Sequence, residues 1–131
     1  MSDATSSTYE VGKRLVELCR AGKNLEAVDS LYAPDVVSVE IHGTDTIPPR
    51  IEGINEVRRK NRWWLDNHTI HGGDAIGPFP HGDRFIVLFK FDVTAKTGPM
   101  ANRRMQMEEA GLYTVRNGKI VKEEFFYHMG G

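Results

Sequence analysis

Apolar residues recur every three or four positions in several stretches of the first half of the chain, which is the spacing of amphipathic helices. The first stretch opens near Ser7, where Ser7 and Glu10 have the spacing of a capping box. The second begins at Asn24 and ends before Pro34, and the third covers Ile54 to Asn67. The pattern therefore predicts three helices, with an extended segment between the second and the third.

Beyond the third predicted helix, apolar and polar residues alternate, which is typical of strands with one buried face. In the stretch from Arg84 to Thr94, the odd-numbered residues are apolar. Glycines interrupt the stretch from Thr69 to Ile76, which favours an edge strand, and Asn117-Gly118 is a hairpin turn signal. Helices followed by mostly antiparallel strands indicate an α+β fold, with the three N-terminal helices packed on one face of the sheet. The predicted strands cover residues 36–42, 69–76, 84–94, 103–115 and 119–128.

The length and charge of the chain exclude several classes of protein. Its 131 residues suit one domain, which we expect to span residues 8–131 after a flexible segment of residues 1–7. The chain has seventeen basic and eighteen acidic residues, so it lacks the excess of basic residues that is typical of a nucleic-acid binder. The N-terminal residues lack the basic start and apolar run of a secretory signal, and no apolar run approaches the ~20 residues of a membrane span, so we expect neither feature. Cys19 is the single cysteine, so we expect a cytoplasmic protein without disulfides, in which this thiol is buried.

Several short motifs carry a resemblance to a known family. They are residues 21–27 (AGKNLEA), 31–37 (LYAPDVV), 51–53 (IEG) and 113–124 (YTVRNGKIVKEE). With these motifs the chain resembles the nuclear transport factor 2-like superfamily, especially its SnoaL-like and ketosteroid isomerase-like members, over about residues 8–128. The resemblance implies a cone-shaped α+β barrel, in which helices and a curved, mostly antiparallel sheet enclose an apolar pocket. It also implies a homodimer formed through the outer face of the sheet.

The resemblance leaves the function open, because isomerases, polyketide cyclases, epoxide hydrolases, dehydratases and binding modules share this fold. We expect cofactor-independent acid/base chemistry, of the isomerase, cyclase or dehydratase (lyase) type, on a small apolar carbonyl compound. The alternative is a non-catalytic module that binds a small ligand or serves only for dimerisation. We expect no nucleic-acid and no membrane partner. The Asp–Arg–Asp arrangement of epoxide hydrolases is matched weakly, since Gln106 follows Arg104 where a carboxylate is needed.

The catalytic positions of the ketosteroid isomerases can be followed residue by residue. Those enzymes use a carboxylate base, with a tyrosine and a protonated aspartate as donors to the ketone. The resemblance places the base at Glu40, which shares a strand face with Ser38 and His42. This polar face suits a wet pocket wall as well as a solvated strand. The tyrosine position falls on Leu15 and the acid position on or next to Gly111, so we do not expect steroid isomerisation by that mechanism.

The register of the last hairpin decides which residues of the final strand face the pocket. A two-residue loop would set Glu109 opposite Phe126, whereas a three-residue loop with a bulge would set it opposite Phe125. Glu109 in an apolar wall would be costly unless paired or protonated, and otherwise it lies wet at the rim. We favour the bulged form, since it groups the following residues on one face: Met107, Tyr113, Val115, Val121, Phe125 and Tyr127.

The remaining features are interpreted as structural or supply candidates for the pocket. His68 and His71 lack a third ligand at a usual spacing, so no metal site is predicted, and no fingerprint of a cofactor site appears. The basic residues 58–60 and 62 are interpreted as a solvated helix face, and Trp64 lies on the apolar stripe. The candidate catalytic residues are Glu40, Glu109 and His42, and the candidate pocket residues are Trp64, Gln106, Tyr113, Phe125 and Tyr127.

Overall fold

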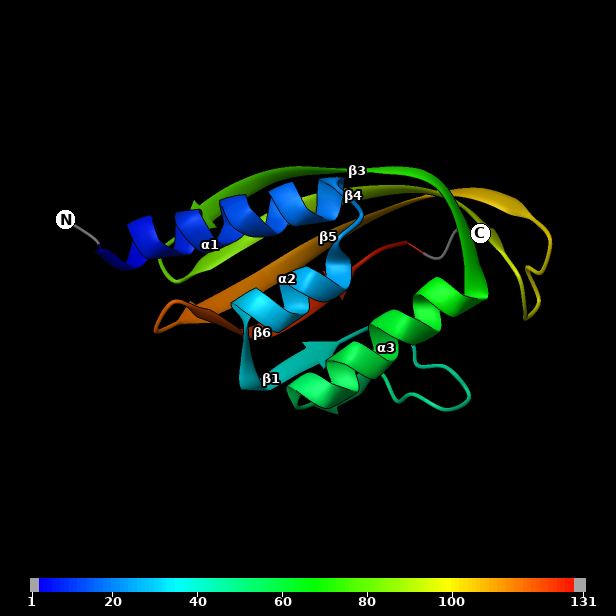
Figure 1. The fold of residues 1–131 in the computed structure, drawn as a ribbon, viewed down its shortest axis with the longest axis horizontal. Coiled ribbons are helices and arrows are strands. Elements are labelled where there is room, and N and C mark those ends of the chain that lie inside the picture. The colour runs from blue at the N-terminus through cyan, green and yellow to red at the C-terminus, as the bar shows by residue number, and fades with distance from the viewer. Residues whose placement is uncertain (1–2, 129–131) are drawn as a thin grey trace.

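The computed structural model describes residues 3–128, which form three helices and a six-stranded sheet (Figure 1). The strand order in the sheet is β2-β1-β6-β5-β4-β3, and β1 and β6 are parallel whereas the other neighbours are antiparallel. The expected α+β class is confirmed. The elements are α1 (Asp3–Arg20), α2 (Asn24–Leu31), β1 (Tyr32–Val39), β2 (Arg50–Glu52), α3 (Ile54–Asn67), β3 (His68–His81), β4 (Arg84–Ala95), β5 (Arg104–Arg116) and β6 (Lys119–Phe126).

Several boundaries differ from those predicted. Helix α1 begins at Asp3, before the predicted start at Ser7, and residues 1–2 lie outside the described residues, so the flexibility of residues 1–7 stays a prediction. Strand β1 begins at Tyr32 and contains Pro34, which does not mark the end of the preceding helix. The proline falls where the pairing of β1 with β6 shifts register, so its missing N–H removes no regular ladder bond. Strand β2 was not predicted, because it is only three residues long.

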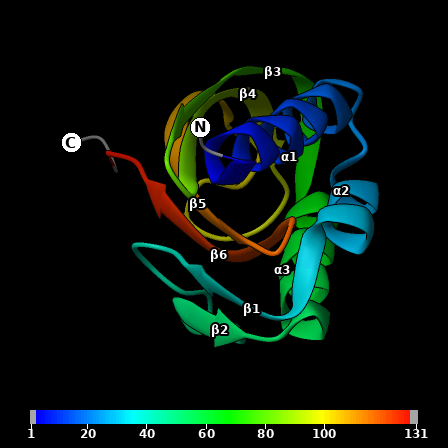
Figure 2. The same ribbon diagram turned by 90° about the vertical axis from the view of Figure 1, so that its left-hand side faces the viewer.

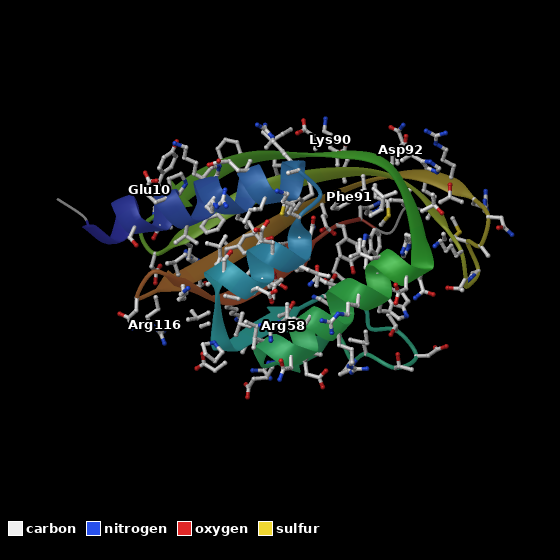
Figure 3. The ribbon with its side chains drawn as sticks, in the orientation of Figure 1. Glu10, Arg58, Lys90, Phe91, Asp92 and Arg116 are labelled. Carbon is white, nitrogen blue, oxygen red and sulfur yellow. The ribbon has the colours of Figure 1, made fainter. Side chains whose placement is uncertain are left out.

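The sheet is curved and wraps around the first helix. Figure 2 shows the strands from β3 to β6 curling around α1, with α2 and α3 on the open side. The predicted alternation in β4 is confirmed, since Phe85, Val87 and Val93 are buried. In Figure 3, Lys90 and Asp92 project from the outer face, whereas Phe91 projects toward the helices. The concave face of the sheet is therefore the apolar face, and the helices cover it.

The β5–β6 hairpin begins in the register of the two-residue loop, so the favoured three-residue loop was wrong, and beyond a bulge it has neither of the predicted registers. Its loop is the two-residue turn Asn117-Gly118, because Arg116 pairs with Lys119. A bulge then inserts Val121 as an extra residue, and beyond the bulge Gly111 pairs with Phe125. One extra residue moves the rest of β6 to the opposite face. The favoured grouping of Tyr113 with Phe125 is therefore correct, although the predicted partner of Glu109 is wrong.

Within residues 3–128, no helix is long and apolar enough to cross a membrane.

Gly111 provides the first test of this packing, because the ring of Tyr113 lies over it. A methyl group on Gly111 would lie 2.7 Å from Cε2 of Tyr113 and 3.2 Å from Cε2 of Phe89, both closer than van der Waals contact. We expect Gly111→Ala to lower the free energy of unfolding by about 1–3 kcal/mol in urea denaturation, as overpacking does. Gly72→Ala is the matched control, since nothing lies within 4 Å of that position in β3. Equal losses in the two variants would contradict the packing.

Candidate functional site

A cavity of about 640 Å³ opens between the concave face of the sheet and the helices. Its volume is in the ~300–1,000 Å³ range of small-molecule sites. A second hollow of about 400 Å³ lies on the outer face, where mainly charged side chains such as Arg50 and Arg116 line it. The larger cavity therefore carries the candidate chemistry. Its aromatic side chains are Tyr32, Trp63, Trp64, Phe89, Phe91, Tyr113, Phe125 and Tyr127, and its titratable groups include Glu40, Lys60, Glu109 and Glu123.

Glu123 forms the buried end of the polar cluster. Its side chain is 2% exposed, and the parallel pairing of β1 with β6 sets it beside Ser38. The hydroxyl of Ser38 donates to Oε2 of Glu123 at 2.6 Å, and the hydroxyl of Tyr32 donates to Oε1. Burial, and then the negative charge of Glu123, raise the pKa of Tyr32 well above its usual value, so this tyrosine is a neutral donor. Burial likewise raises the pKa of Cys19 to about 12, which keeps the half-buried thiol protonated.

Lys60 joins this buried end to the open part of the cavity. Its Nζ, on a side chain only 15% exposed, donates to Oγ of Ser38 at 2.5 Å and to Oε2 of Glu40 at 2.8 Å. It also lies 3.8 Å from Oε2 of Glu123 and 5.0 Å from the ring centroid of Phe125. Lys60 thus connects helix α3 with strands β1 and β6 through charged contacts.

Glu40 is held from two sides. Lys60 contacts one of its carboxylate oxygens, and the hydroxyl of Tyr127 donates to the other at 3.1 Å. Burial, followed by the charge of Glu40, raises the pKa of Tyr127 to about 12. Tyr127 therefore remains a hydrogen-bond donor at neutral pH, and both oxygens of Glu40 have fixed positions in the cavity.

Glu109 has the opposite environment. It is half-buried in the middle of β5, and no hydrogen bond to its carboxyl is found among residues 3–128. Burial, followed by the charges of Glu40 and Glu123, raises its pKa from 4.5 to about 8, although the nearby charge of Lys60 acts in the opposite direction. Glu109 is therefore mainly a neutral carboxylic acid at neutral pH.

Tyr113 places a second neutral donor in the cavity. Its side chain is 2% exposed and lines the cavity, and within the described part of the chain its hydroxyl has no hydrogen-bond partner. A methyl group on Gly111 would lie 3.1 Å from this hydroxyl oxygen. Burial, and next the charge of Glu123, raise the pKa of Tyr113 well above its usual value. The position where the resemblance expects an acid side chain is thus covered by a tyrosine hydroxyl.

The structure brings most of the predicted residues together. Glu40, Glu109, Tyr113, Phe125 and Tyr127 all line the cavity.

The other predicted residues have different places. His42 lines the cavity but is exposed at its rim. Trp64 also lines the cavity, where its ring stacks on that of His68 with 3.7 Å between the ring centroids. The neighbouring Trp63 packs against the core.

Gln106 does not line the cavity, so its prediction as a pocket residue was wrong. It is exposed and pairs with Asp92 on β4. Glu109 and Gln106 lie an odd number of positions apart in β5, and alternation sends their side chains to opposite faces. Arg104 likewise lies outside the cavity, where it forms exposed hydrogen bonds of 2.8 and 2.9 Å with Asp92.

Sequence reasoning missed Lys60 and Glu123, although a signal existed for each. Lys60 was assigned to a solvated helix face, yet it lies three positions after Val57, which is fully buried, and four before Trp64. Glu123 lies two positions before Phe125 on the last strand, so the two side chains share a face. Charge alone had argued for exposure of Lys60, and Glu123 was not considered as a candidate.

Among residues 3–128, no group of three or more His, Cys, Asp or Glu side chains could hold a metal ion.

Comparison with known families agrees with this architecture. Residues 6–127 match the family model of the SnoaL-like domain. The chain belongs to the SnoaL-like domain family. Among curated proteins, none matches this SnoaL-like sequence.

Solved structures show how widely the fold is shared. The crystal structure of a proposed SnoaL-like polyketide cyclase from Mesorhizobium loti is 41% identical, with a TM-score of 0.82 over 90% of this chain and 97% of that chain. An LEH-like epoxide hydrolase from M. tuberculosis is 14% identical, with a TM-score of 0.67 over 95% and 84% of the two chains. A ketosteroid isomerase-like protein from Catenulispora acidiphila, in complex with trimethylamine, is 16% identical, with a TM-score of 0.69 over 92% and 86%. The latter two share the fold alone.

The raised pKa of Glu109 predicts how stability depends on pH. The unfolded chain loses this proton near pH 4.5 and the folded protein near pH 8, so between these values the folded state binds more protons. The contribution of Glu109 to stability therefore falls as the pH rises through this window. We expect urea denaturation to show Glu109→Gln gaining stability relative to the unmodified protein from about pH 4.5 to 8, with no further change above. A stability difference that is constant across this window would contradict the raised pKa.

Proposed function

We propose that this SnoaL-like protein catalyses cofactor-independent proton transfer on a small apolar carbonyl compound, in a reaction of the isomerase, cyclase or dehydratase type. The observation that carries the proposal is a pair of cavity carboxyl groups in opposite environments. Glu40 is paired with Lys60, whereas Glu109 has a pKa of about 8 and no hydrogen-bond partner in the described residues. A carboxylate and a carboxylic acid in one site are what acid/base catalysis near neutral pH requires.

In the proposed reaction, the carboxylate of Glu40 removes a proton from the carbon next to the carbonyl group. The C–H bond breaks, an O–H bond forms on Glu40, and the electron pair moves onto the carbonyl oxygen. The acid of Glu109 and the hydroxyl of Tyr113 donate hydrogen bonds to that oxygen as its charge develops, an interaction worth ~3 kcal/mol per donor. Glu40 then returns the proton to the substrate, at the same carbon or at another one. Tyr127 orients Glu40, and His42 is an exposed polar group at the rim of the cavity.

A second candidate function is the binding of a small ligand without chemistry. Apart from the ion pair of Arg20 with Asp74, three carboxyl groups and one ammonium group line the cavity together with aromatic rings. Such a site suits a small ammonium ion, which aromatic faces and carboxylates attract. The Catenulispora acidiphila protein of the same fold is bound to trimethylamine, which supports this alternative.

The catalytic proposal is tested by deuterium exchange at the methyl group of acetophenone in deuterium oxide, followed by NMR. Exchange requires only removal and return of the proton next to the carbonyl, so it does not depend on the natural substrate. We expect Glu40→Gln to slow the exchange ~10²- to 10⁴-fold and Glu109→Gln to slow it less, since glutamine still donates a hydrogen bond. The matched control is Glu108→Gln, on the exposed neighbour of Glu109.

The outcomes separate the two candidate functions. Exchange that is unaffected by Glu40→Gln and Glu109→Gln would refute the assigned roles. No acceleration by the unmodified protein, together with saturable binding of tetramethylammonium in calorimetry, would favour the ligand-binding alternative.

We also propose a homodimer through the outer face of the sheet. Ile86 and Leu88 on β4 and Phe126 on β6 are exposed there. The pairings Leu88↔Ala110 and Ala110↔Phe126 place Leu88 and Phe126 on the same face of the sheet, on either side of Ala110. An exposed apolar group of this kind is typical of a protein interface.

The dimer is tested by light scattering after gel filtration. We expect twice the chain mass for the unmodified protein and a single-chain mass for Leu88→Lys, because a buried unpaired ammonium opposes association. Met100→Lys is the control, since Met100 is equally exposed but lies in the loop between β4 and β5. A single-chain mass for the unmodified protein would exclude the dimer.

A further inference from the structure

The hydrogen bonds of the buried carboxylate of Glu123 are not explained by the packing of the core alone. Both of its oxygens accept hydrogen bonds, from Tyr32 and from Ser38, in a side chain that is 2% exposed. Buried charges are expensive, and well-packed apolar residues often give equal or greater stability in their place. A role in the cavity is therefore a better explanation for Glu123 than core stability.

Of the two hydrogen-bond donors to Glu123, Ser38 is the one that links it to Lys60 and Glu40. Ser38 donates to Glu123 at 2.6 Å and accepts from Lys60 at 2.5 Å, so one hydroxyl links the two charged groups. Lys60 in turn donates to Glu40 at 2.8 Å. Tyr32 binds the other oxygen of Glu123, and its hydroxyl has no bond to Lys60.

Lys60 needs this support because of its side chain. A lysine ammonium is a point charge on a flexible four-carbon stem, and it does not fix its own direction as an arginine fork does. Here it is fixed by acceptors on two strands, Ser38 and Glu40 on one side and Glu123 at 3.8 Å on the other. The ring of Phe125, 5.0 Å away, covers it. Removal of the Glu123 charge would leave Glu40 as its only ionic partner among residues 3–128.

We propose that Glu123 is a positioning residue of the cavity, which acts through Ser38 and Lys60 to fix the carboxylate of Glu40 in the orientation that meets a substrate. This inference rests on the proposed function, because it assigns Glu123 to the reaction of Glu40. Glu123 itself does not contact the substrate in this arrangement. Its loss should therefore change the rate of proton removal more than the binding of the ketone.

The first experiment measures the state of Lys60 without any reaction of a substrate. Acetic anhydride acylates unprotonated lysines, and mass spectrometry reports the reactivity of each lysine separately. We expect Lys60 to react more slowly than the exposed Lys13 and Lys23 in the unmodified protein. In Glu123→Gln, which keeps the size of the side chain, we expect Lys60 to react ~10-fold faster, because loss of a nearby carboxylate destabilises the ammonium form.

The matched control is Tyr32→Phe. It also removes one hydrogen bond from Glu123, but on the oxygen that faces away from Lys60. If Glu123 serves stability alone, Tyr32→Phe and Glu123→Gln should affect Lys60 alike, and the proposal is then overturned. Ser38→Ala is a second route, since it removes the linking hydroxyl while it leaves both charges in place. It keeps the proposal testable if Glu123→Gln does not fold, as judged by circular dichroism.

The second experiment follows acetophenone exchange in the same variants. We expect kcat to fall ~10-fold in Glu123→Gln and Ser38→Ala with KM changed less than ~2-fold, because only the positioning of the base is lost. An increase in KM at constant kcat would overturn the positioning role. If the unmodified protein gives no exchange at all, the proposed function fails, whereas the reactivity of Lys60 still decides whether Glu123 holds the Lys60–Glu40 pair.

Discussion

The polar half of the cavity depends on one ammonium group. Lys60 reaches from α3 to the sheet, where it contacts Ser38 and Glu40 at hydrogen-bond distance and lies within 4 Å of Glu123. Without this cation, the carboxylates of Glu40, which directly follows β1, and of Glu123 on β6 would repel each other in a largely apolar environment. The ion pairs therefore allow both acidic side chains in the cavity, and they also connect the third helix to the parallel strand pair.

The protonation of the other titratable groups in the cavity depends on which carboxyl groups Lys60 contacts. Apart from Arg20 and Asp74, which pair with each other, three carboxyl groups and one ammonium group line the cavity, and Glu109 is the one of the three that Lys60 does not contact. Burial and the charges of the other two carboxyl groups make the proton on Glu109 favourable at neutral pH. The same negative field and burial keep Tyr113 protonated. The carboxylate of Glu40 and the neutral donors Glu109 and Tyr113 thus line the same cavity.

The sequence was informative where periodicity decides the structure, and less so where single contacts do. The bounds of α3 and the buried face of β4 agree with the pattern, because many apolar positions contribute to each. The predicted register of the β5–β6 hairpin was wrong, because one bulge residue, Val121, moves every later side chain of β6 to the opposite face. The alternation of apolar and polar residues in the sequence does not reveal this bulge. Glu109 was found because a carboxylate among apolar neighbours is conspicuous. The pairing of Lys60 with Glu123 was missed because it joins elements far apart in the chain, and the local signals of their positions beside apolar residues do not show which charges meet.

The protonation of Glu109 tests the central claim most directly, that the cavity holds a neutral carboxyl group, Glu109, beside the charged carboxylate of Glu40. Carbon-13 labelling of the glutamate carboxyl groups, with Glu109 assigned by its absence from the Glu109→Gln spectrum, allows its titration to be followed by NMR. We expect the carboxyl resonance of Glu109 to titrate near pH 8. A Glu109 carboxyl that titrates near its ordinary value of 4.5 would contradict the account, because the cavity would then contain no acid at neutral pH.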